Sequence, residues 1–189
     1  RCDWSSDVCS SDLHLLARQG QVEAARQLLR EQPELDDAQA RRKLVAEAQL
    51  LRDIGQYEQA LQIYGLAMQQ FPDDPDLLYE KALTAKRAGQ YEAMEQMLRL
   101  LMQRQPDYHH AYNALGYSLA DRNLRLQEAR SLIEKALAVD PNDAYILDSM
   151  GWVEFRLGNH AEALRFLKKA FERLPDAEIA AHLGEVHWV

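Results

Sequence analysis

The sequence predicts an all-α fold, a right-handed superhelical solenoid built from antiparallel helix pairs. Prolines recur at intervals of 34, 35 and 34 residues, at Pro72, Pro106, Pro141 and Pro175. Glycines mark the same period at a second position, at Gly20, Gly55, Gly89 and Gly158. Between these marks, apolar residues recur at spacings of three and four, which places them on one face of a helix. A repeat of this length, with two helices in each copy, is typical of a solenoid.

The amino-terminal segment does not follow this pattern. Residues 3–13 read DWSSDVCSSDL, with no apolar period, and the composition changes at His14. Back-translated, this segment matches a common short-read sequencing adaptor; the alternative is a natural Ser-rich linker. We therefore interpret residues 1–13 as a sequencing-adaptor artefact, and expect them to be disordered and to contribute nothing to stability. Both cysteines, Cys2 and Cys9, lie in this segment, so the cysteine spacing predicts neither a disulfide nor a metal pair.

Each repeat reads as two helices joined by a tight turn. Glycine, or Asn123 in one copy, ends the first helix because these residues tolerate a left-handed backbone. Proline follows the second helix, whose interior it cannot continue. Asp107 and Asp143 are expected to cap the helices that follow them. The chain then divides in order into a partial pair, four full repeats and a partial last repeat: 14–40, 41–74, 75–108, 109–143, 144–177 and 178–189.

The full repeats share one order of large and small residues. The repeat 41–74 has Leu44, Ala48, Gly55, Tyr57, Ala60, Tyr64, Ala67 and Pro72. The repeat 75–108 has Leu78, Ala82, Gly89, Tyr91, Met94 and Pro106. The repeat 109–143 has Tyr112, Leu115, Gly116, Ala129, Ile133, Ala136 and Pro141. The repeat 144–177 has Leu147, Met150, Gly151, Gly158, Ala163, Leu167, Ala170 and Pro175. The small residues allow two helix backbones to approach closely, and the large residues fill the remaining space.

These residues resemble the tetratricopeptide repeat (TPR) family. The resemblance implies a TPR array whose first helices line a concave groove, and a protein-protein interaction scaffold that binds a protein or peptide partner there. Glu154 stands where the family pattern usually has an aromatic residue, so the packing at that position is left open. Residues 109–188, from HHAYNALGY to GEVHW, also resemble the carboxy-terminal repeats of long bacterial TPR lipoproteins of pseudomonads and their relatives. That closer resemblance implies a periplasmic adaptor for a carboxy-terminal processing protease and its substrates, on the inner side of the outer membrane.

Composition and motifs argue against other classes of function. The net charge of -8 and the lack of a basic tract disfavour nucleic acid as a partner. No apolar run approaches the length of a membrane-spanning helix. His109 and His110 are adjacent, and His182 and His187 are five residues apart, so neither pair has the spacing of metal ligands on one helix face. No phosphate-binding loop or nucleophile motif is present, so we predict no enzyme activity, no cofactor and no metal.

The predicted partner-binding residues follow from helix geometry. Positions 2, 5, 9 and 12 of each first helix lie on one stripe. The stripe is mixed and basic in the repeats 41–74 and 75–108, and aromatic in the repeats 109–143 and 144–177. With one neighbouring arginine, the aromatic stripe gives the predicted site: His110, Asn113, Tyr117, Tyr145, Asp148, Trp152, Phe155 and Arg156. The alternative is that Trp152 and Phe155 pack inside the array.

Two alternative functions are left open by the sequence. One is a structural self-assembly module, and the other is a non-catalytic TPR arm of a larger enzyme. The segment after Pro175 carries apolar residues with no following helix to cover them, namely Ile179, Leu183, Val186 and Trp188. Because the ends of a solenoid need a polar cap, we expect a truncated chain that frays or self-associates at this edge.

Overall fold

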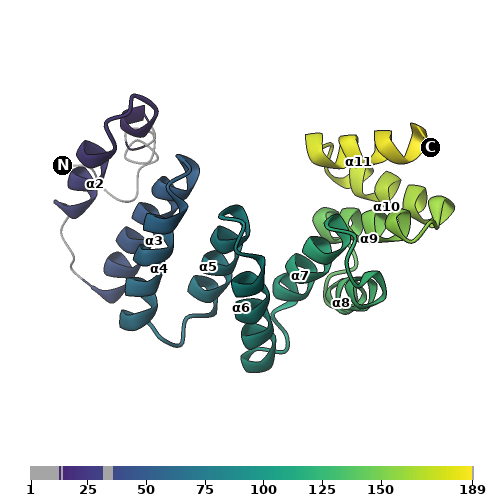
Figure 1. The fold of residues 1–189 in the computed structure, drawn as a ribbon, viewed down its shortest axis with the longest axis horizontal. Helices are drawn as coiled ribbons and strands as arrows, with labels where there is room; N and C mark the ends of the chain where they lie inside the picture. The colour runs from purple at the N-terminus through teal and green to yellow at the C-terminus, as the bar shows by residue number, and fades with distance from the viewer. Residues whose placement is uncertain (1–12, 14, 32–35, 189) are drawn as a thin grey trace. The chain divides into compact units, whose positions relative to one another are not determined.

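The computed structural model describes residues 13, 15–31 and 36–188, and every regular element in this part of the chain is an α-helix (Figure 1). The prediction of an all-α fold is confirmed. The helices with described bounds are α2 (Val22–Arg30), α3 (Asp37–Asp53), α4 (Tyr57–Gln70), α5 (Pro75–Arg87), α6 (Tyr91–Arg104), α7 (His109–Asp121), α8 (Leu126–Val139), α9 (Ala144–Arg156), α10 (His160–Arg173) and α11 (Ala177–Trp188). None of these helices has the length and apolar character needed to cross a membrane.

The turns between paired helices have the backbone that the sequence predicts. Gly55, Gly89 and Gly158 have φ angles of 80°, 75° and 85°, and Asn123 has a φ of 55° where a glycine would otherwise stand. The longer repeat also places Arg125, which precedes α8, in the left-handed region with a φ of 44°. The extra residue of this repeat therefore coincides with a second left-handed position.

Acidic caps begin several of the first helices. The side chain of Asp74 accepts hydrogen bonds from the backbone N–H groups of Asp76 and Leu77 at 3.0 and 3.3 Å. Asp143 accepts in the same way from Ile146 at 2.9 Å, as predicted. The predicted cap Asp107 is wrong, because α7 begins one residue later than that cap requires and Tyr108 takes the capping position without a side-chain bond.

The chain forms two compact units, residues 1–97 and 98–189. In the first unit, α3 and α4 pack together around a core of Ala48, Leu51, Ala60, Tyr64 and Leu77. A second cluster in this unit joins Leu13 to Ala17, Ala25, Leu29 and Leu50. Residues 1–12 of the interpreted artefact lie outside the described part of the chain. The last residue of that segment, Leu13, is helical and buried.

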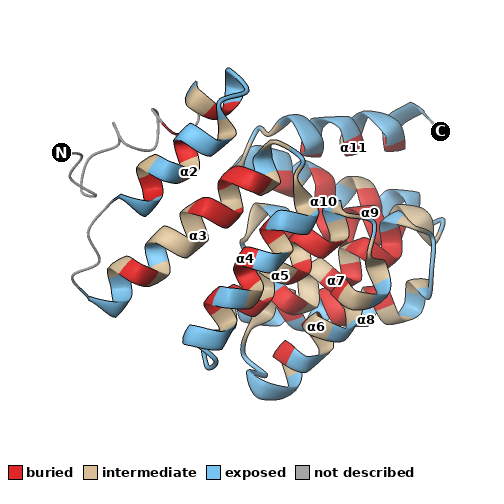
Figure 2. Ribbon diagram, turned by 60° about the vertical axis from the view of Figure 1, so that its left-hand side comes forward, coloured by how far each residue is buried: buried red, intermediate tan, exposed pale blue. Residues whose placement is uncertain are grey.

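In the second unit α9 is the central helix. It packs against α10 and α8, and also against the first helices α7 and α11. Residues 146–154 of this helix are buried without interruption, as the red ribbon of α9 in Figure 2 shows in part. The helix pairs meet closely at two equivalent glycines. A Cβ at Gly116 would lie 2.6 Å from Cγ1 of Ile133, and a Cβ at Gly151 would lie 2.6 Å from Cγ of Leu167.

Arginine–carboxylate pairs join helices of successive repeats. In the first unit these pairs are Arg26 with Glu47, Arg52 with Glu80, and Arg41 with Asp74, the residue that caps the next repeat's first helix, α5. In the second unit they are Arg99 with Glu128, and Arg130 with Glu154. The pair of Arg130 and Glu154 gives a reason for the acid at position 154, where the TPR pattern usually has an aromatic residue. The carboxylate of Glu154 is 2% exposed and accepts hydrogen bonds from Nε of Arg130 at 2.6 Å and from Nδ2 of Asn159 at 2.7 Å.

Candidate functional site

The first helices of the second unit bring several predicted residues together. Helix α7 carries Tyr117, helix α9 carries Asp148, Trp152, Phe155 and Arg156, and both α7 and α11 pack against α9. We call the group formed by these five residues with Glu178 and His182 of α11 the aromatic–acidic cluster.

Trp152 is the centre of the aromatic–acidic cluster. Its indole stacks on the imidazole of His182, with ring centroids 4.2 Å apart and planes inclined by 21°. The ring of Phe155 lies 5.4 Å away, and the guanidinium of Arg156 lies over the indole at 5.5 Å. Only 5% of Trp152 is exposed, so its ring packs within the array here. Its Nε1 is buried and has no hydrogen-bond partner among the described residues.

A buried acid–base pair lies beside this ring. Nδ1 of His182 is 2.9 Å from both carboxylate oxygens of Asp148. Burial raises the pKa of Asp148, and the hydrogen bond from His182 offsets only part of that rise. Burial alone would lower the pKa of His182. The hydrogen bond and charge of Asp148, together with the charges of Glu178 and Glu185, outweigh burial and raise the pKa of His182.

Two further contacts tie the helices of the cluster to one another. The hydroxyl of Tyr117 on α7 donates a hydrogen bond to Oε1 of Glu178 on α11 at 2.8 Å. Burial, followed by this contact with Glu178, raises the pKa of Tyr117. Arg156 donates through Nε and Nη2 to the backbone carbonyls of Ala120 and Asp121, at 3.3 and 3.1 Å. The Arg156 side chain therefore caps the carboxyl end of α7.

The other predicted residues lie nearer the starts of their helices. Tyr145 lies in the first turn of α9 and is 55% exposed. His110 is exposed, and its ring contacts the rings of His109 and Tyr108 at centroid distances of 4.0 and 6.2 Å. Asn113 is half-buried, and its Oδ1 has no hydrogen-bond partner in the described structure.

Sequence reasoning did not assign His182 and Glu178 to the site. His182 follows Asp148 by 34 residues, so it occupies the same position in the next repeat, and Asn113 occupies that position in the preceding one. The equivalence of these positions in successive repeats was the signal in the sequence that could have added His182 to the site. In the described part of the chain no group of three or more His, Cys, Asp or Glu side chains is arranged to hold a metal ion.

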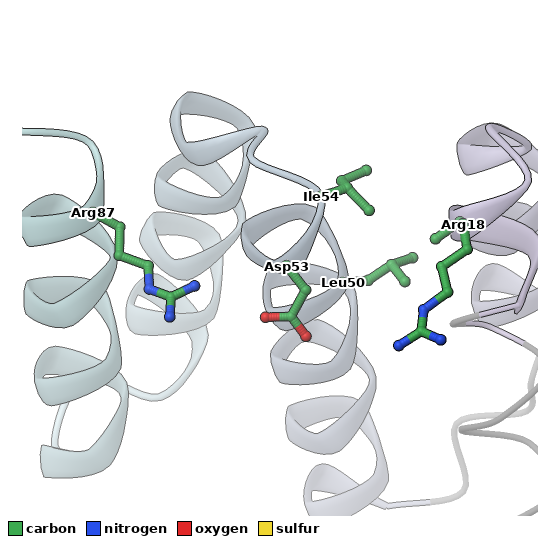
Figure 3. Close-up of a pocket in the computed structure, with 6 residues that line it drawn as sticks. Arg18, Leu50, Asp53, Ile54 and Arg87 are labelled. Carbon is green, nitrogen blue, oxygen red and sulfur yellow. The ribbon is translucent and has the colours of Figure 1, made fainter. Parts of the chain in front are cut away.

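A pocket of about 290 Å³ lies in the first unit. Its apolar lining residues are Ala17, Leu50 and Ile54. Figure 3 shows Arg18 and Arg87 on either side of Asp53. This pocket lies outside the predicted site, and its charged groups are of both signs.

Comparison with known proteins defines the class of this chain. Residues 51–116 match a family model described as tetratricopeptide repeat. The fold matches the crystal structure of TTC0263, a thermophilic TPR protein of Thermus thermophilus. The TM-score is 0.71 at 26% identity, over 78% of this chain and 81% of that one. The chain is a tetratricopeptide repeat protein, and the predicted TPR array is confirmed.

One relative in sequence and one further solved structure also resemble the chain. The chain is 44% identical over 172 residues to the TPR repeat-containing protein PA4667 of Pseudomonas aeruginosa. The match covers 90% of this chain and 29% of PA4667, so the chain spans less than a third of that relative. The fold also matches YrrB, described as a TPR protein with an unusual peptide-binding site. Here the TM-score is 0.61 at 21% identity, over 94% of this chain and 90% of YrrB. None of these likenesses supports the narrower expectation of a lipoprotein adaptor for a protease.

Proposed function

We propose that this chain is an interaction scaffold that binds an extended protein or peptide segment along the first helices of its second unit. Helices held by tight packing offer a rigid surface, which lowers the entropy cost of binding. The observation that carries the proposal is the aromatic–acidic cluster, where aromatic rings from two helices lie beside polar groups. Such rings dominate binding energy at protein interfaces. The peptide-binding site named for YrrB, a protein of the same fold, adds support.

The proposed contact residues are the eight that the sequence predicts, with Glu178 and His182 added. Tyr145 offers an exposed ring, and Tyr117 and Phe155 are half-buried. His110 and Asn113 would line the approach along α7, while Asp148, Trp152 and Arg156 form the base of the surface. We infer a non-catalytic role, because TPR proteins are generally scaffolds.

Substitution of Tyr145 tests this proposal. Peptides would be selected against the purified chain from a random display library, and their affinities compared for Tyr145→Ala and the control Phe171→Ala. Phe171 lies on the second helix α10 and is 36% exposed. Loss of a binding aromatic should cost about 2 kcal/mol, or roughly 30-fold in affinity. Equal affinities for the two variants, with unchanged circular dichroism, would contradict the proposed surface.

The narrower function, a periplasmic adaptor that brings a protease to its substrates, depends on the resemblance of residues 109–188 alone. Co-purification of a carboxy-terminal processing protease with the full-length protein, and its loss in the Tyr145→Ala variant, would support that function. A protease whose activity is indifferent to the added chain would count against it.

Self-assembly is a second candidate, favoured by Trp188. This ring is 92% exposed at the end of α11. Sedimentation velocity at increasing concentration checks it, with Trp188→Ser as the matched variant. A concentration-independent monomer would exclude it.

A further inference from the structure

Carboxylates outnumber cations around the aromatic–acidic cluster. Tyr117 interacts electrostatically with Glu178, Asp121 and Asp148. Asp148 in turn interacts electrostatically with Asp176 and Glu178. Glu178 and Asp121 are both exposed, so part of this negative charge faces solvent.

The cations near the cluster are already engaged. Arg156 and Arg122 donate to backbone carbonyls at the carboxyl end of α7. His182 is bonded to Asp148, and Glu185 lies near it as a further acid. The surface therefore keeps a net negative potential beside its rings, which favours a ligand cation and repels an anion.

The aromatic rings add a second attraction for a cation. A guanidinium or ammonium group binds well where an aromatic face lies next to carboxylates, because the ring quadrupole and the negative charges act together. Tyr117 already holds Glu178 beside its ring through the 2.8 Å hydrogen bond. A carboxylate fixed in this way loses little freedom when a cation arrives.

Trp152 supplies an independent observation. Its side chain is almost fully buried, with 5% exposed, yet Nε1 has no hydrogen-bond partner in the described part of the chain. A buried donor left unpaired is destabilising, because it loses its hydrogen bonds to water. An indole N–H needs an acceptor, and a peptide backbone supplies carbonyl oxygens at regular intervals.

We propose that this surface recognises a basic extended peptide, in which a Lys or Arg side chain lies against Tyr117 between Glu178 and Asp121 and a backbone carbonyl accepts from Nε1 of Trp152. The inference depends on the proposed function and narrows its partner to a basic segment. Nε1 is buried in this structure, so the contact requires side chains around the indole to move. The net charge of -8 adds long-range attraction for such a partner.

Three fluorescein-labelled peptides of equal length test the proposal. One carries alternating Arg residues, the second has Gln at those positions, and the third has Glu. Anisotropy at low salt should show the Arg peptide binding about 10-fold or more tightly than the Gln peptide, and the Glu peptide most weakly. Raising the salt should weaken the Arg peptide most. Equal binding of the Arg and Gln peptides overturns the basic preference and leaves the scaffold function standing. Binding of none of them counts against both.

Matched variants locate the effect. Glu178→Gln and Asp121→Asn should each weaken the Arg peptide several-fold, while Glu172→Gln, an exposed acid on α10, should not. An equal loss in Glu172→Gln would mean that bulk charge alone is responsible. In a chain with Trp4→Phe and Trp188→Phe, the one remaining indole N–H resonance belongs to Trp152. It should shift on binding, and an unmoved resonance at saturation overturns the carbonyl contact.

Discussion

Adding a single methyl group at Gly116 should destabilise the second unit. A Cβ there would lie 2.6 Å from Cγ1 of Ile133 and 2.9 Å from the backbone oxygen of Ala129. The side chain of Ile133 can turn, but the carbonyl oxygen of Ala129 is part of α8 and can retreat only if the helix moves. The substitution Gly116→Ala therefore forces the two helices of this repeat apart.

The magnitude follows from two opposing effects. Overpacking a core typically costs about 1–3 kcal/mol, and alanine regains about 1 kcal/mol over glycine in a helix. The net loss is then about 0–2 kcal/mol, and we expect about 2 kcal/mol at Gly116, at the upper end of this net range. Gly151 should lose about 1 kcal/mol, since the nearest backbone oxygen, that of Ala163, is 3.2 Å away. Gly65 is the control, because its Cβ would meet only Nζ of Lys81, at 3.6 Å. Gly65→Ala should gain up to about 1 kcal/mol.

Urea unfolding followed by circular dichroism measures these differences. For a chain of this length, a change of about 1 kcal/mol moves the thermal midpoint by about 2–4 °C. Repeat arrays can unfold in stages, so hydrogen exchange should confirm that the loss lies in α7–α10. If Gly116→Ala proved as stable as Gly65→Ala, the close approach of α7 and α8 described here would be incorrect.

Three other outcomes are expected. Removing Arg130 leaves the carboxylate of Glu154 buried with Asn159 as its remaining donor, so Arg130→Ala should lower the free energy of unfolding by about 1–3 kcal/mol in urea. The pKa of His182 is raised in the folded chain, so this residue stabilises the fold fully below the unfolded value near 6.5. That stabilisation is lost as the pH rises through the folded value. The pKa of Asp148 is also raised, so it too lowers the free energy of unfolding as the pH rises. The urea midpoint should therefore fall as the pH rises above the unfolded value near 6.5, and His182→Gln should flatten this dependence. Arg125→Gly should raise the thermal midpoint, because the left-handed φ of 44° costs arginine about 1 kcal/mol, and glycine adopts it without that cost.

The period of prolines and glycines predicts the helix pairs because a turn depends on local backbone preference. Asp143 was predicted as a cap for the same reason, and it caps α9. The error at Asp107 has a local cause as well. Aspartate favours both turns and helix caps, so its presence does not show whether the helix begins at the next residue or one residue later. Local preference therefore fixes the order of elements and leaves their ends uncertain by a residue.

The candidate site was harder to predict, for a different physical reason. Helical periodicity places Trp152 on the stripe that was predicted to face a groove, but it does not say which side chains of the next repeat cover that stripe. The cover is His182, which is 34 residues after Asp148 and contributes both a stacked ring and a hydrogen bond. Whether a ring is exposed or covered depends on a side chain of another repeat, and a pattern within one repeat carries no information about it.

The contacts proposed for a partner are also the contacts that hold α11. Apolar packing alone allows neighbouring repeats to slide, whereas directed polar bonds such as Tyr117 to Glu178 and His182 to Asp148 fix one register. A basic peptide on this surface would compete for Glu178 and at the same time neutralise charge around Asp148. Binding and the docking of α11 therefore share one set of groups, and each must change the equilibrium of the other by the same factor. On this proposal α11 is part of the binding surface, and a change at Glu178 should alter both the stability of α11 and the affinity for a partner.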